Sequence, residues 1–275
     1  MDATGTQGVD ASLAIIGGGR MGEAILAGLI SSGAMRSERV VVAEPDPVKR
    51  ETLSAGYGVT CVDAGRAAVS DADVVIIAVK PQVFDVAVAD FADALAGRLV
   101  VSIAAGLSCA RIETLLPAGT AVVRVMPNTP ALVGSGMALI SGGTEASADD
   151  LALVERLFSA VGECLVIEER HQDAGTAISG SGPAYFAMVV DALSRAGVAQ
   201  GLSRDVAQRL AVATMLGTAR LLDETGMHPE ELVDGVSSPG GTTIAAVERL
   251  EAGGLRSAFA DAVGAAVRRS RELGS

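Results

Sequence analysis

The chain has 275 residues, 49 % of them hydrophobic and 20 % charged, so it holds enough apolar material for one large domain or two of ordinary size. A formal net charge of −12, without any basic cluster, excludes nucleic acid as an expected partner. The longest aliphatic runs, such as Val74 to Val79, are far too short to cross a bilayer, so no membrane is expected either. Three cysteines without metal-ligand spacing argue against a zinc site and a disulfide framework, and they favour a cytoplasmic protein with reduced thiols.

Residues 1–12 carry two aspartates, no basic side chain and no apolar core, which predicts a flexible lead-in rather than a signal peptide. From residue 13 to residue 168, short apolar runs alternate with helical patterns, as in an α/β domain with a doubly wound sheet. The runs are continuously apolar, which is typical of parallel strands covered on both faces. We expect strands over Leu13–Ile16, Val40–Ala43, Val59–Val62, Val74–Val79, Leu99–Ile103, Ala121–Val125, Met137–Ile140 and Leu165–Ile167. We expect helices over Met21–Ser31, Pro47–Ala55, Val83–Ala94 and Ala148–Val161.

In the string IIGGGRMG, the glycines follow the first of these strands with the spacing of a dinucleotide-binding turn. Gly17 would permit the tight strand-to-helix turn, Gly19 would let the backbone approach a pyrophosphate, and Gly22 would let the helix pack against its strand. The pyrophosphate would lie over unpaired N–H groups at the positive end of the helix dipole. Because glycine turns also occur for purely structural reasons, this motif alone is weak evidence.

Glu44 ends the second expected strand, 22 residues past Gly22. A carboxylate at this position can accept hydrogen bonds from the adenosine ribose and repels a 2′-phosphate, which favours NADH over NADPH. The string EPDP is also rich in turn residues, so a solvated turn residue is the competing interpretation.

Further strands end in small or constrained residues, at the edge where open α/β sheets bind ligands. AVKPQ (78–82) presents Lys80 before a proline that disfavours helix, although a solvated surface lysine is the alternative. SIAAG (102–106) would let the backbone lie flat against a ribose or nicotinamide. In MPNTP (126–130), Asn128 is held between two prolines, which turn formation explains equally well.

After residue 168 the strand-like runs vanish, and residues 169–275 read as an all-helical domain. We expect helices over Ala184–Ala199, Arg204–Thr225, Pro229–Asp234, Thr243–Glu251 and Leu255–Arg271. Two glycine-rich segments, ISGSGPAY and VSSPGGTTI, each interrupt this pattern and open a new helix. The N–H groups of Gly240, Gly241, Thr242 and Thr243, with two hydroxyls, predict a site for a small carboxylate. An ordinary capped helix is the competing interpretation, and it accounts for one such segment more easily than for two.

Together, IIGGGRMGEAI, AVKPQ, RVMPNTPA, SGSGPAY and SPGGTTI resemble pyrroline-5-carboxylate reductase over nearly the whole chain. The resemblance implies a Rossmann-type domain, a helical domain that interleaves with a second subunit, and further assembly into decamers in some members. It implies that a small anionic cyclic imine is reduced with NADPH or NADH to L-proline, in an active site completed by helical segments of the partner. Implied cofactor contacts are Gly17, Gly18, Gly19, Arg20, Met21, Gly22, Ala78, Val79, Lys80, Pro81, Ala104 and Ala105. Implied substrate contacts are Glu169, Ser238, Gly240, Gly241, Thr242 and Thr243.

Two positions depart from the family pattern. Glu44 stands where many members have small polar residues that admit NADPH, and Gly235 stands where an asparagine often contacts the cofactor. For the reaction itself, Thr243 is the candidate for the hydrogen bond to the ring nitrogen, and orientation of the two reactants would supply most of the catalysis.

Two other functions compete with this one. A β-hydroxyacid dehydrogenase shares the layout but needs a lysine in the second domain, and no lysine follows Lys80. A nucleotide-binding regulator without catalysis would have no need of the hydroxyls in SPGGTTI.

Overall fold

The computed structural model describes residues 9–273, so residues 1–8 of the expected lead-in lie outside the described residues. The chain forms two compact units. The first runs to Ser181 and resumes at Ala266, and the second comprises Gly182–Ala265.

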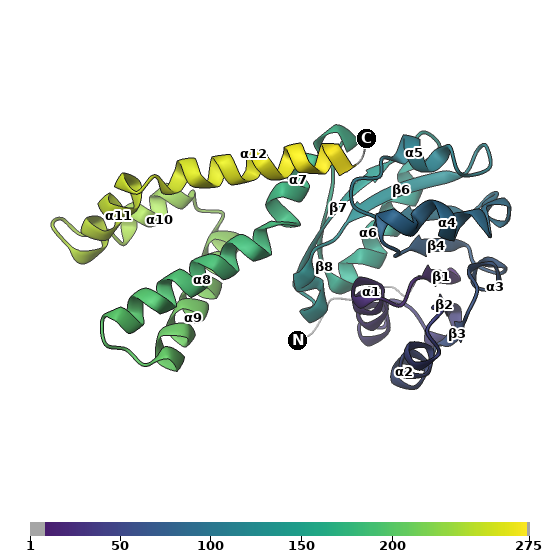
Figure 1. The fold of residues 1–275 in the computed structure, drawn as a ribbon, viewed down its shortest axis with the longest axis horizontal. Helices are drawn as coiled ribbons and strands as arrows, with labels where there is room; N and C mark the ends of the chain where they lie inside the picture. Colours follow the sequence, from purple (N-terminus) through teal and green to yellow (C-terminus); the bar gives the residue numbers. More distant parts are fainter. Residues whose placement is uncertain (1–8, 274–275) are drawn as a thin grey trace. The chain divides into compact units, whose positions relative to one another are not determined.

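The first unit is built on an eight-stranded sheet with the order β3-β2-β1-β4-β5-β6-β7-β8 (Figure 1). The strands are β1 Leu13–Ile16, β2 Val40–Ala43, β3 Thr60–Val62, β4 Val74–Ile77, β5 Leu99–Ser102, β6 Ala121–Met126, β7 Gly136–Gly142 and β8 Gly162–Val166. The order of the first six strands is that of a Rossmann fold. Strands β1 to β3 are added toward one edge of the sheet, and strands β4 to β6 are added toward the other edge. All eight strands expected from the sequence are confirmed, with small shifts at their ends.

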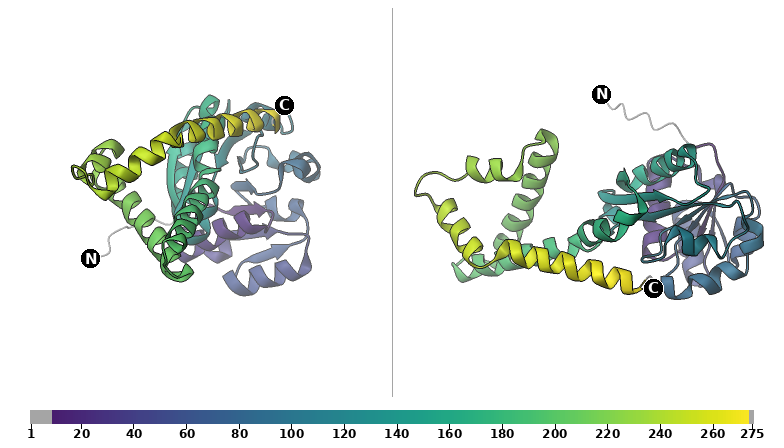
Figure 2. Two further views of the ribbon diagram at one scale, coloured as in Figure 1. Left: turned by 60° about the vertical axis from the view of Figure 1, so that its left-hand side comes forward. Right: turned by 90° about the horizontal axis from the view of Figure 1, so that it is seen from above.

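Helices cover both faces of this sheet (Figure 2). They are α1 Arg20–Ser31, α2 Pro47–Tyr57, α3 Gly65–Val69, α4 Phe84–Ala89, α5 Cys109–Glu113, α6 Ala148–Phe158 and α7 Gln172–Ser179. Successive residues of each strand point to opposite faces, so β1 contributes Ile15 to a core with α1 and α6, and Ala14 to a core with α3 and α4. This two-sided burial explains why the central strands β1, β2, β4 and β5 are almost entirely apolar.

Two strands, β7 and β8, run against the expected direction. β7 pairs with β6 antiparallel, with Val125 opposite Ile140, and β8 then pairs with β7 in parallel. The expectation of a parallel sheet is therefore wrong for the β6–β7 pair. A strand buried on both faces has the same apolar pattern in either direction, so the sequence does not show the reversal.

The helix expected over residues 83–94 is also divided. It forms α4, which ends at Ala89, and a short 3-10 helix over Ala92–Leu95. Phe84, Val88, Phe91 and Leu95 are all buried in the same core. Because the spacing of these four residues also fits one continuous helix, the sequence does not show where the helix breaks.

The second unit is entirely helical within the described residues. Its helices are α8 Gly182–Ala199, α9 Arg204–Thr225, α10 Pro229–Gly235, α11 Thr242–Ala252 and α12 Leu255–Leu273, the last of which ends in the first unit. Ser203 caps α9 by accepting the N–H of Val206, and Gly226 ends it at φ +62°, as the sequence predicts.

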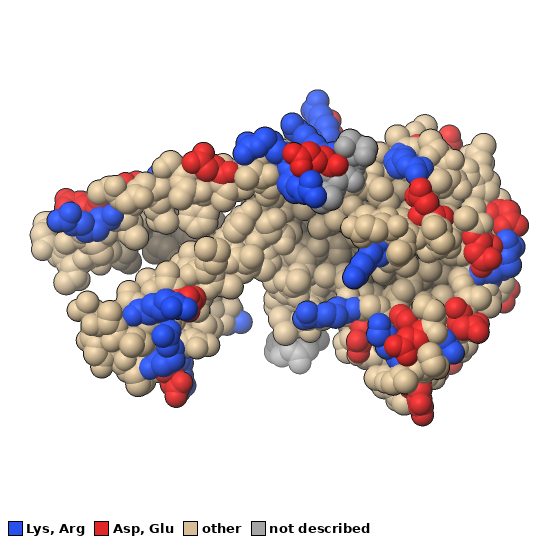
Figure 3. Space-filling view, viewed as in Figure 1, with Lys and Arg blue, Asp and Glu red and all other residues tan. Residues whose placement is uncertain are grey.

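Many large apolar side chains of this unit are exposed, and its surface in Figure 3 carries few charges. They include Phe186, Met188 and Leu193 on α8 and Leu210, Val212 and Leu216 on α9. So large an uncovered apolar surface is typical of a surface that contacts another protein. None of the helices in residues 9–273 has both the length and the hydropathy needed to span a membrane.

Candidate active site

The glycine turn between β1 and α1 has the tight bend and the close helix packing that its spacing predicts, and it leaves open space at Gly19. Gly17 adopts φ +108°, and a Cβ atom there would lie 2.7 Å from the carbonyl oxygen of Ala78. A Cβ atom on Gly22 would strike the carbonyl oxygen of Gly17, so only glycine lets α1 start this close to β1. At Gly19 a Cβ atom would meet no atom within 4 Å, which leaves the turn open on the side where a ligand would approach.

The start of α1 offers N–H groups to that open side. Gly19 is the N-cap residue and provides no side-chain hydrogen bond to the first turn, which begins with Arg20, Met21 and Gly22. The first N–H groups of a helix have no partner within it, and together with the helix dipole they favour an anion. This geometry fits the pyrophosphate of a dinucleotide.

Glu44, at the end of β2, holds the same turn from the other side. Its Oε2 accepts the N–H of Gly18 at 3.0 Å, and its Oε1 accepts the N–H of Asp46 at 3.0 Å. The residue is only 6 % exposed. The competing interpretation of a solvated turn residue is therefore wrong, because the carboxylate is buried against the glycine turn.

The ends of β4 and β5 lie beside this turn in the sheet. The N–H of Ala78 donates to Ile16 at 2.8 Å, and the side chain of Val79 lies 3.4 Å from where a Cβ on Gly17 would stand. Lys80 is exposed at the start of the 3-10 helix Pro81–Val83. After β5, the N–H of Ala104 donates to the hydroxyl of the buried Ser102 at 3.3 Å, which folds the small residues 104–105 against the strand end.

Asn128 has a structural role at the end of β6. Its Oδ1 accepts the N–H of Met137 at 2.9 Å, and its Nδ2 donates to the carbonyl oxygen of Ser179 at 2.9 Å. Both ends of the amide are therefore used, which supports the interpretation that it organises the chain locally.

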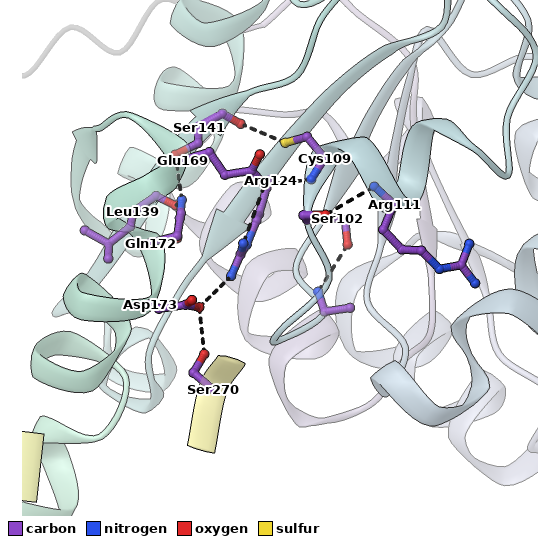
Figure 4. A network of polar contacts seen from close by, with 12 residues as sticks. Ser102, Cys109, Arg111, Arg124, Leu139, Ser141, Glu169, Gln172, Asp173 and Ser270 are labelled. Carbon is purple, nitrogen blue, oxygen red and sulfur yellow. Dashed lines mark hydrogen bonds and ion pairs between the residues drawn. The ribbon is translucent and has the colours of Figure 1, made fainter. Parts of the chain in front are cut away.

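Glu169 belongs to a polar network beneath α7, drawn in Figure 4. Its Oε1 accepts the N–H of Cys109 at 2.6 Å and lies 3.5 Å from Nη1 of Arg124, while its side chain is 29 % exposed. Burial and the nearby Glu169 carboxylate raise the pKa of the Cys109 thiol to about 12. Cys109 is thus a neutral, buried thiol.

Arg124 is the centre of this network; it opens the motif RVMPNTPA, but the sequence analysis gave it no role. It lies on β6 with a side chain only 7 % exposed, and its Nη2 lies 3.6 Å from Oδ1 of Asp173 on α7. Oδ1 of Asp173 also accepts the hydroxyl of Ser270 on α12 at 2.8 Å. The available signal was the single charge in the strand sequence AVVRVM, because a buried cation requires anionic partners.

The segment between α10 and α11 makes a tight turn in the second unit. Gly240 adopts φ +64°, and the N–H of Gly241 donates to the carbonyl oxygen of Ser238 at 2.9 Å. A Cβ atom on Gly241 would collide with Ser238. Gly241 is the N-cap residue of α11 and gives no side-chain cap to Thr242 and Thr243, so the first turn of α11 is open to an anion.

The expected site residues thus form two groups. The glycine turn, Glu44 and the ends of β4 and β5 lie together in the first unit, where Glu169 has the partners described above. The expected substrate residues Ser238, Gly240, Gly241, Thr242 and Thr243 lie together on one turn of the second unit. Among the described residues no group of His, Cys, Asp and Glu is arranged to hold a metal ion.

A Rossmann-type sheet with this glycine turn and an added helical unit defines a nicotinamide-dependent oxidoreductase. Residues 12–106 match the family model for "NADP oxidoreductase coenzyme F420-dependent", and residues 169–273 match that for "Pyrroline-5-carboxylate reductase dimerisation". The chain belongs to the pyrroline-5-carboxylate reductase family.

Individual relatives support this membership over the full length. The chain is 47 % identical to pyrroline-5-carboxylate reductase of Synechocystis sp., covering 95 % of this chain and 98 % of the relative. The enzyme of Corynebacterium melassecola is 43 % identical, with 96 % and 98 % covered. Among solved structures, the reductase of Coxiella burnetii has a TM-score of 0.92 at 35 % identity, with 96 % of this chain and 99 % of that chain covered. The Plasmodium falciparum enzyme with NADP bound has a TM-score of 0.88 at 28 % identity, with 97 % and 99 % covered.

Proposed function

We propose that this protein reduces 1-pyrroline-5-carboxylate to L-proline, the last step of proline biosynthesis, with a reduced nicotinamide dinucleotide as the electron donor. The observation that carries the proposal is the uncapped first turn of α11, preceded by the turn from Ser238 to Gly241. A small carboxylate fits such a helix start. The segment also falls within the part of the chain that matches the reductase dimerisation model.

The cofactor would be held by the first unit. Gly17, Gly18, Gly19, Arg20, Met21 and Gly22 would lie under the pyrophosphate. Ala78, Val79, Lys80 and Pro81, with Ala104 and Ala105, would lie along the ribose and nicotinamide. When bound there, the reduced nicotinamide supplies the hydride for the reaction. The small side chains at residues 78, 104 and 105 leave the strand ends flat enough for a ring to approach.

We further propose that the cofactor is NADH. The N–H groups of Gly18 and Asp46 hold the carboxylate of Glu44 at the end of β2. A fixed negative charge at this place accepts hydrogen bonds from ribose hydroxyls and opposes a 2′-phosphate. Arg50 does not cancel this charge directly, because its Nη1 donates to the backbone carbonyls of Glu44 and Pro45.

The substrate would be held by the turn at residues 238–243. N–H groups at the start of α11, with the hydroxyls of Ser238 and Thr242, would bind its carboxylate. The hydroxyl of Thr243 would make the hydrogen bond to the ring nitrogen. An imine is a better hydride acceptor when its nitrogen is protonated, so a hydrogen-bonding group at this atom favours the reactive form. Beyond that, holding the two reactants in the correct orientation can supply about 7–11 kcal/mol of the barrier reduction.

Glu169 would lie on the substrate side of the cofactor domain. The N–H of Cys109 and Nη1 of Arg124 both approach Oε1 of its carboxylate. The side chain is 29 % exposed, so Oε2 can take a further donor such as a water or the substrate. Arg124 and Cys109 keep the carboxylate in place for this role.

We also propose that residues 13–168 bind the cofactor and that residues 169–275 bind substrate and join the subunits. The apolar side chains left exposed on α8 and α9 would be covered by a second copy of the chain, with interleaved helices, and dimers of this kind can assemble into decamers. A cytoplasmic location agrees with three cysteines that form no disulfide.

The test is an assay of the purified protein with pyrroline-5-carboxylate, following the oxidation of NADH and NADPH in separate reactions. Turnover with NADH that exceeds turnover with NADPH is the expected result. Absence of turnover with both would contradict the reductase proposal, whereas a preference for NADPH would contradict only the role given to Glu44. Light scattering on the same sample measures the assembly, and a monomer would contradict the proposed subunit contact.

A further inference from the structure

Within residues 9–273, a few side-chain oxygens are buried without a hydrogen-bond partner, namely Oε1 of Gln172, Oγ1 of Thr176 and Oγ of Ser237. The first two belong to α7, and only Ser237 lies in the second unit. Ser237 stands in the segment that joins α10 to α11 (Figure 1), and its hydroxyl oxygen exposes less than 1 Å². A buried hydroxyl that bonds to nothing is costly, so such an atom calls for an explanation.

The turn before α11 does not need this hydroxyl for its shape. The backbone N–H of Ser237 donates to the carbonyl oxygen of Asp234 at 3.1 Å, and the carbonyl oxygen of Ser238 accepts the N–H of Gly241 at 2.9 Å. Gly240 adopts φ +64°, a conformation that glycine takes without strain. These backbone features already define the path of the chain from α10 to α11.

The start of α11 lacks acceptors in the same way. The first four N–H groups of an α-helix have no partner within it. The N–H of Gly241 is used in the turn, whereas those of Thr242, Thr243 and Ile244 make no hydrogen bond within residues 9–273. These donors and the hydroxyl of Ser237 thus lie in one short segment without an acceptor. A carboxylate, with two acceptor oxygens, is the kind of group that satisfies them.

We propose that Ser237 is a substrate-binding residue, whose hydroxyl donates to the carboxylate of the imine beside the N–H groups at the start of α11. The inference rests on the proposed function, from which it takes the place of the substrate carboxylate at this turn. A hydrogen bond to an ionised group is stronger than one between neutral groups. The hydroxyl that is unpaired in the free protein thereby becomes a binding contact.

Ser237→Ala removes the hydroxyl and keeps the backbone contacts of the turn. Since the hydroxyl has no partner in the protein, the melting temperature of the variant without ligand should equal or exceed that of the unchanged protein. Ser237→Cys nearly keeps the side-chain volume but offers only a weak donor. It therefore tests the hydrogen bond rather than the space, and it carries the test alone if the alanine variant does not fold.

In the full-length enzyme, Ser237→Ala is expected to raise KM for pyrroline-5-carboxylate about tenfold or more, the effect of losing one hydrogen bond to a charged group. The change in kcat should stay within about twofold, because the carboxylate does not react and keeps the same contacts in the transition state. The dissociation constant of L-proline, measured by calorimetry, should rise by a similar factor, since the product carries the same carboxylate. Ser237→Cys should show the same pattern.

Ser194→Ala is the matched control in the same unit. Ser194 is 2 % exposed on α8, and its hydroxyl donates to the carbonyl oxygen of Val190 at 2.7 Å. This buried hydroxyl has its partner within the protein and lies outside the turn. KM and the affinity for L-proline should therefore be unchanged in this variant.

An unchanged KM in both Ser237 variants of an active enzyme would overturn the proposal. So would a marked fall in the melting temperature of ligand-free Ser237→Ala, which would show that the hydroxyl already has a partner in the folded protein. A rise in KM of the same size in Ser194→Ala would also overturn it, because the effect would not be specific to the turn. If the unchanged enzyme shows no turnover with either dinucleotide, the reductase proposal itself fails, which separates the two results.

Discussion

The N–H of Gly18 donates to Oε2 of Glu44 at 3.0 Å, which joins the glycine turn after β1 to the residue that ends β2. The carboxylate therefore has two roles. It would select the ribose of the cofactor, and it also holds the turn on which the pyrophosphate would lie. A substitution at this position changes both.

Glu44→Ser is expected to raise the ratio of NADPH to NADH turnover about tenfold or more, since a repulsive charge near the 2′-phosphate is removed. Both dinucleotides should nevertheless bind more weakly, because the N–H of Gly18 loses its acceptor. Steady-state kinetics with each cofactor measure the ratio. Glu44→Gln keeps one acceptor oxygen for the two N–H groups, so its dinucleotide affinity should lie between those of the unchanged protein and Glu44→Ser. An unchanged ratio of NADPH to NADH turnover in both variants would contradict the role of the charge.

Gly22→Ala and Gly19→Ala should differ although both change one glycine of the same turn. At Gly22 the new Cβ would collide with the carbonyl oxygen of Gly17, so α1 must move and the protein should lose about 1–3 kcal/mol of stability. At Gly19 nothing lies within 4 Å, so folding should be kept while dinucleotide affinity falls. Thermal unfolding and fluorescence titration separate the two effects. Equal melting temperatures for the two variants would be inconsistent with this packing.

Thr243→Ala is expected to lower kcat/KM about 10- to 100-fold, the loss of a hydrogen bond to a charged group worth about 1.5–3 kcal/mol. Thr243 lies in the first turn of α11 without a capping role, so the melting temperature should not change. Thr243→Ser keeps the hydroxyl and should retain most of the activity. Full activity of the alanine variant would show that the hydroxyl does not take part.

Stability should fall at alkaline pH because of two thiols, the buried Cys109 and the half-buried Cys164. Burial raises the pKa of Cys109 to about 12 and that of Cys164 to about 11, from 9.0. Above pH 9 the unfolded chain therefore releases these protons while the folded protein keeps them, so the free energy of unfolding decreases as pH rises. The buried thiol of Cys109 contributes a slope of at most about 1.4 kcal/mol per pH unit in its window, and the half-buried Cys164 contributes less because solvent screens it.

Urea unfolding of Cys109→Ala at a series of pH values tests this assignment. The absolute stability of the variant will differ because the side chain is buried, but its slope between about pH 9 and 11 should be smaller by the contribution of one thiol. A slope equal to that of the unchanged protein would show that Cys109 does not titrate differently on folding.

The sequence predicted the strands and the long helices because each has a periodic or continuous apolar pattern. Arg204–Thr225 is predicted to the residue, since Ser203 and Gly226 mark its two ends chemically. Three shorter helices were not predicted. Gly65–Val69 and Cys109–Glu113 span too few residues to show a period, and Gln172–Ser179 runs into the glycine-rich segment that follows it.

The site was predictable where it depends on local backbone geometry. Gly17, Gly19 and Gly22 have their roles because of spacing along one turn, which a sequence displays directly. Contacts between residues that are far apart in the sequence cannot be predicted in this way. Arg124 and Asp173 are 49 positions apart in the sequence (173 − 124), and only the folded sheet brings the guanidinium of one to the carboxylate of the other.

The reversed direction of β7 determines where the chain leaves the first unit. Because β7 and β8 run opposite to β6, the chain emerges from β8 level with the middle of β6, where the carbonyl oxygen of Ile167 accepts the hydroxyl of Ser141. α7 then runs along β6, with Asp173 near its start beside Arg124 and Ser179 at its end bonded to Asn128. If β7 and β8 ran parallel to β6, the chain would leave β8 at the carboxyl ends of the strands, and α7 would then carry it to the opposite edge of the sheet. The single antiparallel pair thus delivers the exit of the chain to the same rim as Ala78 and Ala104, the rim proposed to receive the nicotinamide.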